Sequence, residues 1–329
     1  MTGEHLRMVV VGAGSLGCLY GAWASSAGVD VTLVASPRHA PVFERVGLTV
    51  IDLEGRSMKQ QPVVVRSLAE VEECDVLLLA TKAQDSDDAL RDLKWRPRAA
   101  WSVQNGAGQA AFLQDYFGSA AVGCASMVGG TLEAEGTVRH TFRGATYVGA
   151  LSTSDPEALH LVESANGAEA RIECRDDIDA VMWSKAVLAV AAMGTSIVLR
   201  VPYHKVFLSS AAASLFLDLL HEGASVVRAI GSELVDLPGP LQVATLASVP
   251  RAEAIALMRA VGEAMVGSGQ TSVRVSMLQS VDSGRSLEHN AVFGYAIETA
   301  QAHGVAVPIT ELVHRVARFL DRRAQSEIQ

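Results

Sequence analysis

Three glycines near the start of the chain have the spacing of a dinucleotide-binding turn. Gly12, Gly14 and Gly17 follow an apolar run at residues 8–11, and a helix-compatible segment and a second apolar run at 29–34 come after them. In a G-x-G-x-x-G turn the first glycine permits the tight turn, the second lets the backbone approach a pyrophosphate, and the third lets the helix pack on the strand. The amides and the dipole at such a helix start favour phosphate. The sequence therefore predicts a dinucleotide-binding site formed by Gly12, Ala13, Gly14, Ser15, Leu16 and Gly17. The alternative is a glycine-rich turn with a purely structural role.

The residues after the second apolar run indicate which dinucleotide binds. A carboxylate about 20 residues past the glycines usually holds the ribose of NAD, whereas an arginine there accommodates the 2′-phosphate of NADP. This chain has Ala35, Ser36, Pro37 and Arg38 at that point, and therefore no carboxylate. NADPH is the predicted cofactor, with Arg38 as the phosphate partner. The alternative for Arg38 is a solvated loop arginine.

A single charged residue in an apolar stretch of the second half is a candidate proton donor. Lys185 is the only charged residue within 182–199. A lysine is costly to bury unless it is paired or deprotonated, and both conditions suit general acid–base chemistry. The alternative is a lysine at a helix start that extends its amine to solvent.

The stretch 271–295 is unusually polar between apolar flanks. Its polar residues include Ser276, Asp282, Arg285, Glu288 and Asn290. Glu288 lies at the start of a predicted helix that becomes apolar within one turn, so its carboxylate could point into a cleft. The alternative is an ordinary acidic residue favoured by the helix dipole.

Polar residues also follow two predicted strands of the first half. Lys82 comes after the apolar run DVLLLAT, and Asn105 with Gly106 comes after the next strand. Ligands of open α/β sheets bind beyond the carboxyl ends of the strands, so both side chains are placed for a nicotinamide ribose. The alternatives are a solvated lysine and a turn asparagine.

The predicted elements give an α/β fold with a helical second half. Strands alternate with helical segments in the first half, which is typical of a Rossmann-type parallel sheet. Strands are expected at 8–11, 29–34, 62–65, 75–81 and 99–103, and a helix at 85–93. Short strands at 121–127, 136–142, 145–149 and 170–174 are expected to extend the sheet in antiparallel fashion. We expect a boundary after Asp177 that separates an NADP-binding domain (1–177) from a helical substrate and dimerisation domain (178–329), with helices at 178–198, 209–231, 251–266, 287–303 and 309–325.

Length, net charge and cysteine spacing limit the number of domains and argue against several classes of partner. A chain of 329 residues is long for one domain, and a net charge of −9 argues against nucleic-acid binding. The four cysteines are widely spaced, which predicts buried thiols in a reducing compartment and no metal site. The longest apolar helical stretch, 186–201, is shorter than the roughly 20 residues of a membrane span. We expect a cytoplasmic protein without a membrane partner. Its long apolar helices after Ile178 can bury a homodimer interface or pack within one chain.

Seven motifs together resemble those of the ketopantoate reductase (2-dehydropantoate 2-reductase) family along nearly the whole chain. They are GAGSLG at 12–17, TK at 81–82, QNG at 104–106, W-x-K at 183–185, SMLQ at 276–279, GR at 284–285 followed by Glu288, and AHGVAVP at 302–308. The resemblance implies a Rossmann domain plus a helical domain, with NADPH as reductant. It also implies reduction of a 2-oxo acid to a 2-hydroxy acid, as in the conversion of ketopantoate to pantoate in pantothenate biosynthesis.

The resemblance also implies roles for individual residues. Lys185 matches the lysine that gives a proton to the substrate carbonyl oxygen as hydride arrives from the nicotinamide. Glu288 matches the acidic residue that holds the substrate and that lysine, and it borders the cofactor. Ser276 matches a serine near the substrate carboxylate, while Lys82 and Asn105 match residues beside the nicotinamide and the substrate.

The chain departs from the family pattern at three substrate-binding positions. Ala189, Met193 and Phe293 stand where family members usually have asparagine. Loss of three hydrogen bonds of about 1 kcal/mol each would cost ~3 kcal/mol of substrate or transition-state binding. Either other groups compensate, or the substrate is a more apolar ketone or an imine. A third reading, a non-catalytic NADPH-binding regulator, would need neither Lys185 nor Glu288.

Overall fold

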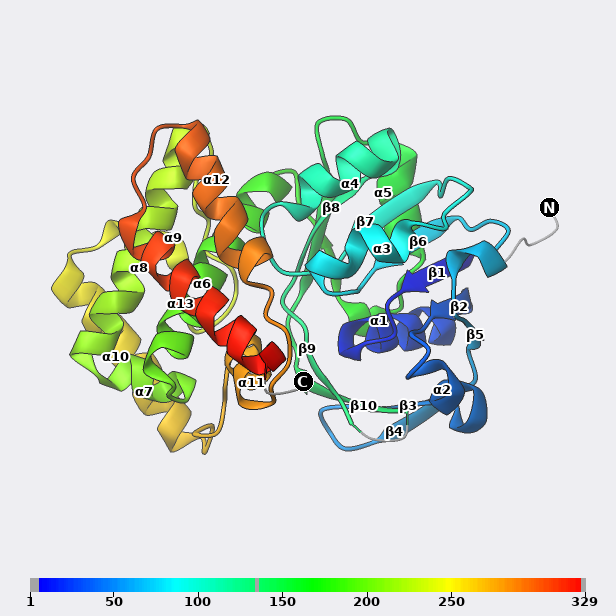
Figure 1. Ribbon diagram of the computed structural model, residues 1–329, viewed down its shortest axis with the longest axis horizontal. Coiled ribbons are helices and arrows are strands. Elements are labelled where there is room, and N and C mark those ends of the chain that lie inside the picture. Colours follow the sequence, from blue (N-terminus) through cyan, green and yellow to red (C-terminus); the bar gives the residue numbers. More distant parts are fainter. Residues whose placement is uncertain (1–5, 134–135, 327–329) are drawn as a thin grey trace. The chain divides into compact units, whose positions relative to one another are not determined.

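The chain forms two compact units. The computed structural model describes residues 6–133 and 136–326, with side chains described as far as Asp321 (Figure 1). The first unit comprises Met1–Gln104 and Gln109–Ile178, and the second comprises Asn105–Gly108 and Asp179–Gln329. The short segment Asn105–Gly108 thus belongs by its contacts to the second unit, although the chain on both sides of it belongs to the first. The functional domains 1–177 and 178–329 stay a prediction.

A parallel sheet with the predicted Rossmann-type arrangement forms the centre of the first unit. Its five strands, in spatial order, are β5 Val63–Val65, β2 Asp30–Val34, β1 Arg7–Val11, β6 Val76–Leu79 and β7 Ala99–Ser102. The register places Met8 beside both Val31 and Val76. Because β1, β6 and β7 are covered on both faces, they are continuous apolar runs rather than alternating ones. Strand order reverses between β1 and β6, which is the switch point where such sheets bind ligands.

Helices and short turns complete the sheet layer. They are α1 Ser15–Ser26, α2 Ala40–Val46, η1 Leu68–Glu70, η2 Ala83–Asp85, α3 Ser86–Leu90, α4 Gln109–Phe117, η3 Gly118–Ala120, α5 Pro156–Ser164 and η4 Ala168–Ala170. The helix α1 carries Tyr20, whose buried hydroxyl contacts the hydroxyls of Ser126, at 2.8 Å, and Thr146. Edge-to-face contacts of Tyr20 with Trp23 and Trp101 fix the helix further. The middle of α1 is therefore anchored to the first unit through Tyr20.

Two smaller sheets follow from the later strands. β8 Val122–Ser126, β11 Thr146–Ala150 and β12 Ile172–Cys174 form one sheet, in which β8 and β11 are antiparallel. A single bridge between Ala100 and Ala121 joins this sheet to the β7 edge of the parallel sheet, where extension was expected. β3 Leu48–Ile51, β4 Ser57–Gln60, β9 Gly129–Leu132 and β10 Thr137–Phe142 form a separate mixed sheet. The predicted strand at 136–142 is thus part of that sheet rather than of an extension.

Between Asp179 and Ser326 the described chain contains helices and no strand, as predicted for the second half. They are α6 Ile178–Leu199, α7 Tyr203–Leu208, α8 Ser210–Ala229, α9 Val243–Ser248, α10 Arg251–Gly267, α11 Ser276–Asp282, the π-helical turn η5 Asn290–Gly294, α12 Tyr295–Ala302 and α13 Pro308–Ser326. A second core, with Phe207, Phe216 and Phe293 fully buried, lies among these helices. The helices α12 and α13 are the orange and red ribbons of Figure 1.

Two expectations need correction. The apolar helix α6 has 22 residues and is long and apolar enough to cross a membrane, so the expectation that it is too short is wrong. Of its most apolar window, 67% is buried in the structure, and such burial explains the composition equally well. Cys174 is exposed rather than buried, and its thiol donates a hydrogen bond to Glu163.

Candidate active site

The glycine turn lies at the switch point of the parallel sheet and leaves no room for side chains at two of its glycines. A Cβ on Gly12 would lie 2.6 Å from the amide nitrogen of Thr81 and 2.7 Å from the carbonyl carbon of Ala80. A Cβ on Gly17 would collide with the carbonyl oxygen of Gly12. These contacts are the close turn and the close helix–strand packing that the spacing predicts.

Gly14 has the opposite surroundings, because a Cβ there would meet no atom within 4 Å. Gly14 is the N-cap residue of α1, and its carbonyl accepts the amide of Cys18 at 2.9 Å. The amides of Ser15, Leu16 and Gly17 lie in the first turn, where a helix offers no internal acceptor. Open space in front of outward N–H groups suits a phosphate. The structure of this turn thus fits a dinucleotide.

A buried glutamine that the sequence reasoning did not select organises the neighbouring strand ends. The Gln104 carboxamide donates to the carbonyl of Thr81 at 2.9 Å, to the hydroxyl of Thr81 at 3.0 Å and to the hydroxyl of Ser86 at 2.8 Å. It therefore ties the end of β7 to the residue before Lys82. Lys82 itself is half-buried just beyond β6. The QNG motif contains Gln104, but nothing local to it predicts these partners.

Arg38 lies in the loop after β2 with its side chain exposed. Burial lowers the pKa of the neighbouring His39, and the positive charge of Arg38 lowers it further. The loop between Val34 and Ala40 contains no acidic residue. The structure thus leaves this loop open to an anionic group, while the role of Arg38 stays a prediction.

In the helical unit, the segment Asn105–Gly108 packs on the turn that follows Glu288. Gly106 has a φ of +104°, and a Cβ on it would collide with the carbonyl oxygen of Ala291. A Cβ on Gly108 would lie 2.7 Å from the ring of Tyr295. Close packing of two backbones at this point fixes Asn105 beside η5. Two segments that the sequence singled out, around Asn105 and around Glu288, are therefore neighbours.

Lys185 is the eighth residue of α6, two turns from its start, and is half-buried. The adjacent Ser184 hydroxyl is fully buried and accepts the amide of Val235 at 2.8 Å, which anchors this turn of the helix. Ala189, one helical turn further on, is half-buried. Met193, a further turn on, is 9% exposed and belongs to the helical core.

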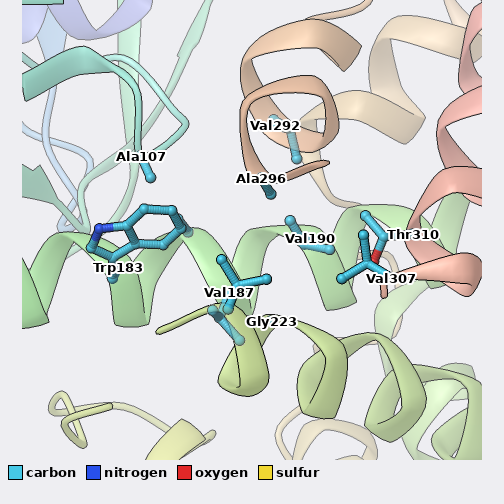
Figure 2. Close-up of a pocket in the computed structure, with 11 residues that line it drawn as sticks. Ala107, Trp183, Val187, Val190, Gly223, Val292, Ala296, Val307 and Thr310 are labelled. Atoms are coloured by element: carbon cyan, nitrogen blue, oxygen red, sulfur yellow. The ribbon is translucent and has the colours of Figure 1, made fainter. Parts of the chain in front are cut away.

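An apolar pocket lies where three of these segments converge (Figure 2). Trp183, Ala186, Val187 and Val190 line it from α6, and Ala107 lies over the Trp183 ring. The remaining lining comes from Gly223, Val226, Val292, Ala296, Val307 and Thr310. About 390 Å³ of empty space lies among these residues, but this volume includes open solvent and the enclosed part is small. Its walls can receive an apolar group but offer almost no hydrogen bonds.

The remaining predicted residues occupy different settings. Glu288 is half-buried and precedes the helix, and its carbonyl accepts the amide of Val292 at 3.1 Å. Ser276 is exposed at the first position of α11. Phe293 is fully buried in the helical core, 6.3 Å from the ring of His314. Direct contact of Ser276 or Phe293 with a substrate stays a prediction.

No metal centre is present among the described residues, where three or more His, Cys, Asp or Glu side chains nowhere converge.

Two alanine substitutions in the glycine turn should have opposite effects. Gly14→Ala should change the free energy of unfolding by less than about 0.5 kcal/mol, because its φ of −83° suits alanine and the space is open. It should still weaken NADPH binding at least tenfold, about the loss of one charge-assisted hydrogen bond. Gly17→Ala should lower the free energy of unfolding by roughly 2–3 kcal/mol. Thermal melts and NADPH fluorescence titrations would measure both, and unchanged NADPH affinity in the stable Gly14→Ala variant would contradict the predicted dinucleotide-binding site.

Comparison with known proteins agrees with these features. The family model for ketopantoate reductase PanE/ApbA matches residues 8–153, and its C-terminal counterpart matches residues 177–321. A 2-dehydropantoate 2-reductase of Pyrococcus abyssi is 24% identical over 312 residues, covering 94% of this chain and 95% of the relative.

Solved structures with the same fold include a PanE/ApbA family ketopantoate reductase from Ralstonia eutropha, with a TM-score of 0.80, 22% identity and coverage of 97% of this chain and 100% of that one. A D-mandelate dehydrogenase in complex with NADH and anilino(oxo)acetate has a TM-score of 0.80 at 19% identity, with the same coverage. Because the family models cover most of the sequence, this protein belongs to the ketopantoate reductase family and is an oxidoreductase.

Proposed function

We propose that this protein reduces a 2-oxo acid to the corresponding 2-hydroxy acid with NADPH, and that ketopantoate is the first candidate substrate. The observation that carries the proposal is the convergence within the helical unit of the segments bearing Lys185, Asn105 and Glu288. Most curated relatives are named 2-dehydropantoate 2-reductases, which supports the substrate, although at 24–27% identity.

The residues of the helical unit supply acid chemistry in this proposal. The glycine turn would hold NADPH through its pyrophosphate, and the bound cofactor would supply the hydride that C2 of the oxo acid accepts. The Lys185 ammonium donates a hydrogen bond to the carbonyl oxygen and gives up its proton as that oxygen gains negative charge, so that the hydroxyl forms. Glu288 holds this ammonium through its carboxylate. The Asn105 amide and the Ser276 hydroxyl orient the substrate, and Lys82 contacts the cofactor.

The cofactor is assigned to NADPH because of the loop after β2. Ser36 and Arg38 are exposed there and no carboxylate is available to a ribose diol. The related D-mandelate dehydrogenase structures contain NADH, so a nicotinamide cofactor has independent support, whereas the phosphate preference depends on Arg38.

A second candidate function is reduction of a more apolar 2-oxo acid or of an imine. The apolar pocket beside Trp183 supports it, as do Ala189 and Met193 at positions where the family usually has asparagine. A D-mandelate dehydrogenase shares the fold, and its bound anilino(oxo)acetate carries an aromatic ring. This candidate keeps the same cofactor and the same proton donor.

The proposal includes a cytoplasmic location and a possible homodimer. All four cysteines are free thiols, which suits a reducing compartment. Leu312 and Phe319, which lie on one side of α13, are 54% and 66% exposed and could be covered by a second copy. Light scattering on the purified protein would determine the oligomeric state.

Removal of the Lys185 amine should greatly slow reduction of the substrate without weakening NADPH binding. Lys185→Ala should lower kcat at least ~100-fold, because it removes the general acid, while the Kd for NADPH stays within about twofold, since the glycine turn is untouched. Stopped-flow absorbance with ketopantoate and a panel of branched and aromatic 2-oxo acids would measure the rate. Lys205→Ala, an exposed lysine on α7, is the control. Undiminished turnover would remove Lys185 from the mechanism.

Arg38→Ala should reduce the preference for NADPH over NADH. A charge-assisted hydrogen bond to the 2′-phosphate is worth about 1.5–3 kcal/mol, so kcat/KM for NADPH should fall roughly ten- to hundredfold. The kcat/KM for NADH should stay nearly constant. Arg45→Ala, which removes an exposed arginine from the neighbouring α2, controls for net charge. An equal loss of kcat/KM with NADPH and with NADH would show that Arg38 does not recognise the 2′-phosphate.

Ala189→Asn should distinguish the two substrate candidates. Ala189 is half-buried, so an amide fits there with less disruption than at the fully buried Phe293. If ketopantoate is the substrate, or binds in the same orientation, one added hydrogen bond of about 1 kcal/mol should raise kcat/KM for it about fivefold. The kcat/KM for aromatic 2-oxo acids should fall. If kcat/KM changed in the same direction and to the same extent for ketopantoate and for aromatic 2-oxo acids, residue 189 would not determine substrate specificity.

A further inference from the structure

A single carboxylate on α13 contacts the residues on both sides of Glu288. The amide of Leu287 donates to Oδ1 of Asp321 at 2.7 Å, and Nε2 of His289 lies 3.8 Å from Oδ2 of the same carboxylate. Asp321 is only 9% exposed, so little water competes for it. Asp321 thus contacts the backbone of the residue before Glu288 and the side chain of the residue after it.

A pair of histidines continues this attachment. Nδ1 of His289 lies 3.0 Å from Nε2 of His314, which in turn lies 3.2 Å from Oδ1 of Asn290. His289 and Asn290 are the two residues after Glu288, and His314 belongs to α13. Four residues therefore hold the helix start at Glu288 from one side, and none of them carries a role in the proposed reaction.

One arrangement of protons is compatible with all of these contacts. Asn290 Oδ1 is an acceptor and takes the Nε2–H of His314, while the nearby Asp321 carboxylate favours an N–H on His289 Nε2. His289 Nδ1 then has a lone pair, and the single Nε2–H of His314 is shared between this nitrogen and Asn290 Oδ1. The opposite tautomer of His289 would direct a lone pair at a carboxylate. The chain of contacts thus runs from Asp321 through neutral His289 to neutral His314.

We propose that Asp321, His289 and His314 are positioning residues that fix Glu288 for catalysis, and that they do so only while both histidines are neutral. The inference depends on the proposed function through the role of Glu288. It goes beyond that function because it assigns a task to side chains that touch neither the substrate nor the cofactor.

The electrostatics around the pair favour the neutral form. Burial lowers the pKa of His289 and of His314, and the positive charge of Arg318 lowers both further. Asp321 and the Asn290 side chain act in the opposite direction on His289 only, and His289 lowers the pKa of His314. Because the folded pKa values lie below the ordinary value of about 6.5, the arrangement is complete above that pH. It is lost progressively as the pH falls below it.

The π-helical turn explains why such an attachment is useful. η5 begins two residues after Glu288 and replaces the ordinary α-helical hydrogen bonding over Asn290–Gly294. A π turn is an irregular start for a helix and is frequent at functional sites. Side-chain contacts to α13 can hold this start in one geometry where regular hydrogen bonding does not.

Kinetics of matched variants would test the inference. Asp321→Asn should lower kcat about tenfold at pH 7.5 because it removes a charged acceptor, and His314→Ala should lower it about fivefold because it removes a neutral hydrogen bond. The KM for NADPH should not change. His314→Gln, whose carboxamide N–H can replace the Nε2 donor, should restore most of the activity and reduce the loss below pH 6.5. His303→Gln, which changes the exposed histidine immediately after α12, should have the wild-type pH profile.

Histidine NMR gives a readout that does not depend on activity. Long-range ¹H–¹⁵N correlations should show His289 and His314 as neutral Nε2–H tautomers at pH 7.5, and a His289 Nδ1–H tautomer would overturn the inference. Glu288→Gln separates the two proposals. Full activity in Glu288→Gln would defeat the assigned role of Glu288 and so the proposed mechanism. Loss of activity in Glu288→Gln together with full activity in Asp321→Asn and His314→Ala would defeat only the positioning role.

Discussion

The fold of the first unit depends on one close approach between backbones. The peptide at Gly12 lies so near Ala80 and Thr81 that a methyl group cannot enter between them. This approach brings the ends of β1 and β6 together at the point where strand order reverses, and it directs the first turn of α1 outward. The open surroundings of Gly14 follow from the same geometry. The phosphate binding proposed for these main-chain amides needs no charged side chain within the turn itself.

In the helical unit, polar groups lie on largely apolar helices and need neighbouring contacts that fix their positions. Lys185 is held through its neighbour Ser184, whose buried hydroxyl binds the amide of Val235. Asn105 is held through Gly106, which packs against the backbone of Ala291. In both cases a residue next to the group proposed for chemistry fixes the local backbone.

The sequence predicted those parts of the fold whose signals are strong and local. The central strands are continuous apolar runs, the glycine spacing is specific, and the long helices have extended apolar faces. The helix α2 and the strands β3 and β4 were missed because they are short and partly exposed, so their patterns are weak. The helix α5 was missed although Asp155 and Pro156 form a recognisable helix start, with Asp155 accepting the amide of Glu157.

The candidate site was predictable in its segments but not in its contacts. Residues such as Gln104 and Asp321 act on partners 18 to 34 positions away, and local sequence has no signal for such pairs. The π turn after Glu288 was also unpredictable, because its composition suits an α-helix equally well. Burial of Phe293 in the core likewise follows from tertiary packing, since its position on a polar segment suggested an accessible side chain.

The assignment of Asn105–Gly108 to the helical unit has a consequence for dissecting the molecule. The polypeptide passes between the units three times, after Gln104, after Gly108 and after Ile178. A fragment that begins near residue 178 would lack the four-residue loop, leaving the Ala291 carbonyl, the Tyr295 ring and the Trp183 indole without their covering backbone. A cut of the chain near Ile178 would therefore leave the loop Asn105–Gly108 on a different fragment from the helices that it packs against.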